Sequence, residues 1–145
     1  MLPLRYSRRW HAASMMLLLF VLAATMMPAV WFWSDRHVFL TWFVDADKWL
    51  HGITFVLLAL WFAGQYRPRS YWRIGIGLIL FGFLIEGCQR LVTYRSADWF
   101  DIWADTAGIV VGLVIAAAGI GGWSLRIETW YLRRAMDIHV DLSVC

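Results

Sequence analysis

The chain has 145 residues, of which 61% are hydrophobic, and its formal net charge at pH 7 is +3. A soluble domain of this size would not carry so large an apolar fraction, so the composition favours a membrane protein. The small positive charge requires no nucleic-acid partner, because basic residues in a membrane protein serve as topology signals and lipid-headgroup contacts.

Four long apolar runs predict an all-α membrane protein, in which one domain over residues 1–145 forms a bundle of four transmembrane helices. The helices are expected at about residues 12–33, 48–65, 71–90 and 101–123. A helix needs about 20 residues to cross the hydrocarbon core. The middle two runs reach that length only when their polar ends are counted, and those ends must then lie in the interface or in a cavity lined by protein.

Basic residues are unevenly distributed between the connecting segments. Nine lie before the first run, between the second and third, and after the fourth: Arg5, Arg8, Arg9, Arg67, Arg69, Arg73, Arg126, Arg133 and Arg134. The segments expected on the opposite side of the membrane contain four basic residues. The positive-inside rule therefore predicts that both termini lie in the cytoplasm, in a bacterial inner membrane. Residues 124–134 are expected to form a short interfacial helix, followed by a loosely ordered tail.

Ionisable and polar side chains recur at one end of the last three runs. They are Lys48 and His51 in the second, Glu86, Gln89 and Arg90 in the third, and Arg95, Asp98, Asp101 and Asp105 at the start of the fourth. A charged side chain near the bilayer centre costs roughly 2.5–3.5 kcal/mol on insertion scales, so such residues mark functional sites. Their shared depth predicts a polar pocket just inside the extracytoplasmic face.

The candidate catalytic residues are His51, Glu86, Asp101 and Asp105, because a histidine beside carboxylates can act as a general base. The carboxylates could instead hold a divalent cation or form buried ion pairs with the nearby basic residues. The candidates for binding a phosphate headgroup are Lys48, Gln89, Arg90, Arg95 and Asp98. A purely structural histidine remains a second interpretation.

The fourth run carries its acidic and small residues on one helical face. Asp101, Asp105, Gly108 and Gly112 are spaced by four, three and four residues, and the two glycines form a GxxxG element. The glycines are expected to pack against a neighbouring helix. The acidic part of the same face must then point into the bundle.

The order and spacing of these residues over about positions 45–115 resemble the VanZ-like family of small bacterial membrane proteins. The motif runs from Asp47-Lys48-x-x-His51 through Glu86-x-x-Gln89 to Arg95-Ser96-x-Asp98-x-x-Asp101-x-x-x-Asp105. The family often has asparagine where this chain has Asp105. The resemblance implies a multi-helix inner-membrane protein, and the founding member of the family is associated with resistance to teicoplanin. The resemblance does not indicate which reaction the protein would catalyse.

Three functions are compatible with the sequence. The first is an enzyme that modifies a lipid or a lipid-linked phosphate headgroup in envelope metabolism. The second is a non-catalytic protein that binds an envelope ligand or supports a partner complex. The third, a small transporter, is less favoured, because the cytoplasmic half of the runs is expected to contain no polar lining.

Overall fold

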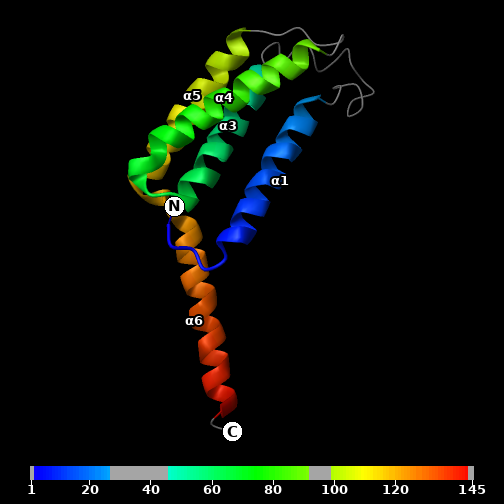
Figure 1. Ribbon diagram of the computed structural model, residues 1–145. Helices are drawn as coiled ribbons and strands as arrows, with labels where there is room; N and C mark the ends of the chain where they lie inside the picture. Colours follow the sequence, from blue (N-terminus) through cyan, green and yellow to red (C-terminus); the bar gives the residue numbers. More distant parts are fainter. Residues whose placement is uncertain (1, 27–45, 92–98, 144–145) are drawn as a thin grey trace.

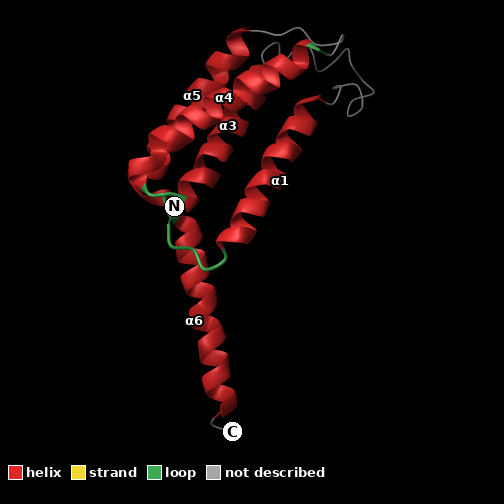
Figure 2. Cartoon of the chain, in the orientation of Figure 1, coloured by secondary structure: helices red, strands yellow, loops and turns green. Residues whose placement is uncertain are grey.

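The computed structural model describes residues 2–26, 46–91 and 99–143, by backbone alone at 46–47 and 135–143 (Figure 1). Every regular element in these ranges is helical, which confirms the predicted all-α class (Figure 2). The elements are α1 (Ser7–Met26), α3 (Ala46–Gln65), the short 3-10 helix η2 (Pro68–Ser70), α4 (Tyr71–Arg90), α5 (Trp99–Ile115), the π-helical segment η3 (Ala116–Ile120) and α6 (Trp123–Ser143).

The helix boundaries differ from the expected ones mainly at the ends of the first and last apolar runs. Helix α1 begins at Ser7 rather than near residue 12, and residues 27–33 of its expected range lie outside the described residues. Helix α5 becomes π-helical at Ala116. The chain then turns at Gly119 and Gly122, whose φ angles are 138° and 72°. Only glycine adopts such angles readily, so the predicted single helix over about 101–123 ends here.

Helix α6 corrects the prediction of a short interfacial helix with a loose tail. It continues from Trp123 to Ser143, over 21 residues, and extends away from the other helices (Figure 1). This sequence contains neither glycine nor proline, so nothing in it interrupts a helix.

The remaining helices form a bundle with α3 at its centre. Helix α3 contacts α4, α5, η3 and α6, and α1 packs against α4 and bonds to α3 through Ser14. Phe55, Leu58 and Ala59 of α3 meet Ile85 of α4 and Ile109 of α5 in the core, and each of these side chains is at most 2% exposed.

In the part of the chain that the structure describes, three helical segments are long and apolar enough to cross a membrane, by length and composition: Ser7–Met26, Pro68–Arg90 and Trp99–Ile120. Helix α3 is not among them, and its ends carry the polar side chains of Lys48, His51 and Gln65.

Glycines allow α5 to lie unusually close to α3. A Cβ atom at Gly108 would collide with the backbone of Gly52, and one at Gly112 would lie 2.7 Å from both the Ala59 Cβ and the Val56 carbonyl oxygen. The backbones of the two helices therefore touch over two turns. The contacts rise together in residue number along both helices, so α3 and α5 run parallel.

Candidate functional site

One end of the bundle collects the buried polar residues that the sequence singled out. Helices α1 and α4 end here, whereas α3 and α5 begin here (Figure 1). The exposed fractions are 5% for His51, 4% for Glu86, 2% for Gln89, 5% for Asp101 and 3% for Asp105. Burial of so many polar groups is costly unless they satisfy one another or meet a ligand.

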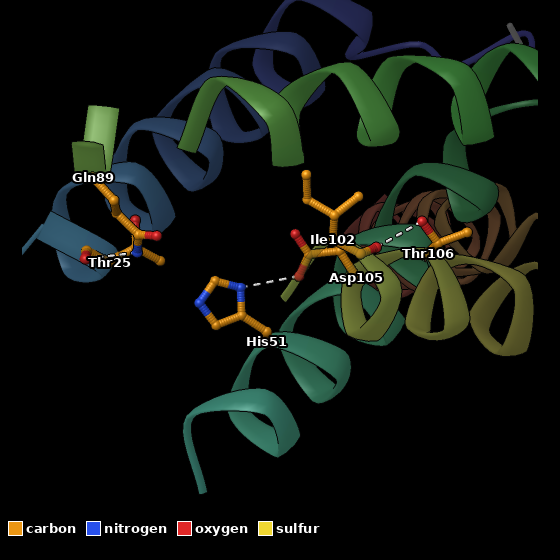
Figure 3. Close-up of polar contacts among 6 residues, drawn as sticks. All are labelled: Thr25, His51, Gln89, Ile102, Asp105 and Thr106. Atoms are coloured by element: carbon orange, nitrogen blue, oxygen red, sulfur yellow. Dashed lines mark hydrogen bonds and ion pairs between the residues drawn. The ribbon is translucent and has the colours of Figure 1, made fainter. Parts of the chain in front are cut away.

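His51 and Asp105 form the central contact of this end. The Nδ1 atom of His51 lies 3.0 Å from Oδ1 of Asp105, and Figure 3 shows the ring of His51 turned edge-on toward the carboxylate. An ionised carboxylate only accepts hydrogen bonds, so Nδ1 carries the proton when Asp105 is ionised. The Nε2 atom of a neutral ring then presents a lone pair, as a general base requires.

Local packing explains why these two side chains meet. The close approach of Gly52 and Gly108 brings the α3 and α5 backbones together one turn from the pair. On the third side, a Cβ atom at Gly82 of α4 would lie 2.8 Å from Oδ2 of Asp105. Small residues on three helices thus leave room for the Asp105 carboxylate and fix its place beside His51.

Glu86 of α4 lies near the His51–Asp105 pair. Its carboxylate is influenced electrostatically by Asp101, Arg90, His51 and Asp105, so three carboxyl groups and an imidazole share one region. Oε1 of Glu86 is buried and has no hydrogen-bond partner among the described residues. A buried polar atom of this kind calls for an explanation such as a ligand, an ion or a water molecule.

The divalent cation that the sequence left open remains a prediction. Among the side chains that the structure describes, at residues 2–26, 48–91 and 99–134, no group of three or more His, Cys, Asp or Glu is arranged to hold a metal ion. The contact that these side chains do form is a histidine–carboxylate pair.

The candidate headgroup-binding residues occupy different places. Gln89 is buried, and its Nε2 donates to the carbonyl oxygen of Thr25 at 3.4 Å, which joins α4 to α1 (Figure 3). Lys48 and Arg90 lie near the α5 N-terminus, over the rings of Phe100 and Trp99 at 5.1 and 5.7 Å. Arg95 and Asp98 lie outside the described residues.

A groove between α1 and α3 reaches His51. Its volume is about 170 Å³, and its lining comprises Phe20, Val21, Ala24, Thr25, Leu50, His51, Thr54 and Phe55. Of these residues only His51 is ionisable. The groove is therefore mostly apolar, unlike the polar pocket expected from the sequence, and the carboxylates are not part of its lining.

The opposite end of the bundle contains a polar cluster that the sequence analysis missed. Trp61 Nε1 and Gln65 Nε2 each donate to the Ser14 hydroxyl at 3.0 Å, and Ser14 donates to the Trp10 carbonyl oxygen. Ser14 and Gln65 are 6% and 1% exposed. The expectation that this half contains nothing polar is therefore wrong. The polar groups bond to one another, which is typical of helix packing rather than of a transport pathway.

Glu128 is the second unexpected residue. Its carboxylate accepts hydrogen bonds from the backbone N–H groups of Arg5 and Tyr6 at 2.8 and 3.2 Å and from Trp10 Nε1 at 2.8 Å. It therefore ties the two residues that precede α1, and Trp10 in its first turn, to α6. No local sequence signal could reveal a contact supplied from more than 100 residues away.

The helical fold and its apolar spans define a helical membrane protein. Residues 2–120 match the sequence model of the VanZ/LLP1 family, so the chain belongs to this family. This result confirms the resemblance inferred from the spacing of the polar motif. No curated protein and no solved structure matches the chain.

Proposed function

We propose that the protein is an enzyme of the bacterial inner membrane that acts on the phosphate headgroup of a lipid or a lipid-linked envelope precursor. The observation that carries this proposal is the double role of His51. Its Nδ1 is held by Asp105, and the same side chain lines the groove between α1 and α3.

His51 would act as the general base. Its Nε2 takes the proton of a water molecule or a ligand hydroxyl as that oxygen attacks phosphorus, and the proton is returned to the departing oxygen. Asp105 holds the ring and stabilises its protonated form. Positioned proton transfer of this kind contributes roughly 10²–10⁴-fold in rate. Lys48, Arg90 and Arg95 would neutralise the phosphate, while Glu86 and Asp101 would orient the ligand or the ring.

The lining of the groove favours a substrate that comes from the bilayer. Phe20, Val21, Leu50 and Phe55 offer apolar surface directly beside His51. The volume of about 170 Å³ is below the roughly 300–1,000 Å³ of complete small-molecule sites, so the groove would hold only part of a ligand. An acyl or isoprenoid chain fits such a lining, and its headgroup would then lie at the polar end of the helices.

The proposal includes four membrane spans with both termini in the cytoplasm. It is supported by the parallel packing of α3 beside α5, with Gly52 against Gly108 and with Val56 and Ala59 against Gly112. A second support is that Arg5, Arg8, Arg9, Arg67, Arg69 and Arg73 all lie at the end of the bundle opposite His51.

Binding without turnover is the second candidate. The burial of His51 and Asp105, which are 5% and 3% exposed, favours it, because a base needs access to its substrate. In that case the protein would sequester an envelope ligand or assist a partner. A contribution to glycopeptide resistance would follow from either function if the ligand were a cell-wall precursor.

The deciding experiment is lipid mass spectrometry of cells that contain equal membrane levels of the wild type, His51→Gln, Asp101→Asn or His11→Gln. His11 is a matched control, because it is exposed at the other end of the bundle and bonds to the Ser7 carbonyl oxygen. We expect one lipid or lipid-linked species to change with the wild type and His11→Gln but not with the other two variants. An unchanged lipid profile in every strain would refute the enzyme and favour binding.

A further inference from the structure

A second groove lies away from His51, where α3 ends and α4 begins. Its volume is about 340 Å³, within the roughly 300–1,000 Å³ of sites that hold small ligands. Tyr66, Ser70 and Arg73 line it at the α3–α4 turn. The rest of its lining is apolar and includes Leu18 of α1 and Phe62 of α3.

The groove follows one face of α4. Ser70, Arg73, Gly77 and Phe81 are spaced by three, four and four residues, and all four line it. At 1.5 Å per residue this face is about 16 Å long. The polar and charged residues are at its beginning, whereas its inner part contains Gly77, Leu78 and Phe81. The groove therefore has the polarity of an amphiphile.

Positive charge marks the polar end. Arg73 lies over the ring of Trp72, with 5.2 Å between its guanidinium carbon and the ring centroid. Arg67 and Arg69 are exposed in the adjoining turn, and the first turn of α4 has no acidic residue. An occupant that complements both the charge and the apolar interior carries a negative headgroup and a hydrocarbon chain.

We propose that this groove binds an anionic phospholipid of the bilayer. The phosphate would contact Arg73 and the hydroxyl groups of Tyr66 and Ser70, and one acyl chain would lie over Gly77 toward Phe81. This site lies at the other end of the bundle from the His51–Asp105 pair, so it does not depend on the function proposed for that pair.

Two substitutions on α4 test the site. Gly77→Leu should fill the groove, because Gly77 lines it and a Cβ atom there meets no atom within 4 Å. Gly87→Leu is the matched control, since Gly87 is equally open on the same helix but does not line the groove. Arg73→Gln removes the charge and leaves the groove open.

The measurement is native mass spectrometry of the full chain in a non-ionic detergent, titrated with phosphatidylglycerol or phosphatidylcholine. We expect the wild type and Gly87→Leu to bind one phosphatidylglycerol more tightly than phosphatidylcholine. Gly77→Leu should weaken both lipids. Arg73→Gln should weaken phosphatidylglycerol by roughly tenfold, the equivalent of one charge-assisted hydrogen bond, and leave phosphatidylcholine unchanged.

Several results would overturn the proposal. One such result is that Gly77→Leu binds phosphatidylglycerol as tightly as the wild type does. Another is that only Arg73→Gln weakens phosphatidylglycerol binding, which would indicate a surface contact with the headgroup alone. A dimer that disappears in Gly77→Leu without loss of lipid would show that a second copy occupies the groove. If Gly77→Leu fails to fold, dihexanoyl phosphatidylglycerol serves instead. If the wild type binds this short-chain lipid as tightly as it binds the long-chain lipid, the acyl chain does not contact the groove.

Discussion

The carboxylate of Asp105 links three helices. Its backbone belongs to α5, its Oδ1 accepts from His51 of α3, and its Oδ2 lies where Gly82 of α4 leaves space. Asparagine, which the VanZ-like family often has at this position, could fill the same space but would present no negative charge to the imidazole. The carboxylate of this chain can therefore form a charge-assisted hydrogen bond with His51 that asparagine could not.

Mutation of the pair should reveal the coupling between its members. Asp105→Ala leaves the buried Nδ1–H group of His51 without its acceptor and should cost about 1–3 kcal/mol of unfolding free energy. The double variant His51→Ala/Asp105→Ala should cost less than the sum of the single variants, by about 0.5–3 kcal/mol. Unfolding in mixed micelles measures these values. If the losses of the two single variants simply add up in the double variant, the hydrogen bond contributes nothing to stability. His11→Ala is the control and should leave the free energy of unfolding nearly unchanged.

At the level of helices, the small face of α5 determines how near α3 can lie. Gly108 and Gly112 touch the backbone of α3 at Gly52 and Val56, and the His51–Asp105 pair is one turn away from the first of these contacts. The same packing that stabilises the bundle therefore sets the geometry of the candidate site.

Gly108→Ala should separate the two helices at the position of the site. The added methyl group collides with the backbone of Gly52, which cannot move aside as a flexible side chain could, so we expect a loss of about 1–3 kcal/mol. Gly87→Ala, where the added atom meets nothing within 4 Å, should be neutral or slightly stabilising. Thermal unfolding of the purified variants measures both. Equal stability of the two variants would contradict the close packing.

Glu128 joins α6 to α1 at the opposite end. Glu128→Ala leaves the N–H groups of Arg5 and Tyr6, just before α1, and the Trp10 indole without this acceptor, and an unpaired buried donor costs roughly 1–3 kcal/mol. We expect faster hydrogen exchange in residues 5–12 and along α6. Thr129→Ala is the control, because the Thr129 hydroxyl bonds only to carbonyl groups of its own helix. Unchanged exchange in Glu128→Ala would show that another contact anchors α6.

For the whole molecule, the sequence was sufficient to predict helices, the family and the end of the bundle where polar residues gather. Run length predicts the helices locally, and the spacing of the polar residues indicates the family and the end of the bundle. The sequence was not sufficient for the Ser14–Gln65 contact or the contacts of Glu128 with Arg5, Tyr6 and Trp10, because such pairs depend on how distant helices pack. The length of α6 was underestimated because an amphipathic helix without a continuous apolar run gives a weak signal.

The last prediction concerns the number of membrane crossings. Helix α3 is not among the segments whose length and composition suit a membrane span, yet it packs parallel to α5, with Gly52 beside Gly108 and Val56 beside Gly112. If α3 crosses the membrane, the α3–α4 turn and the C-terminus lie in the cytoplasm and the segment after α1 lies outside. If it does not cross, all three positions lie on the outer side.

Single-cysteine variants distinguish these arrangements. Native Cys88 is replaced by serine, and one cysteine is kept at position 145 or introduced by Arg36→Cys or Arg69→Cys in a Cys145→Ser background. A membrane-impermeant maleimide added to spheroplasts should label the Arg36→Cys variant alone, and lysis should make the other two reactive. Labelling of all three before lysis would contradict four spans. The four-span result would place His51 at the outer face, where an envelope headgroup can reach it, and Arg73 at the inner face.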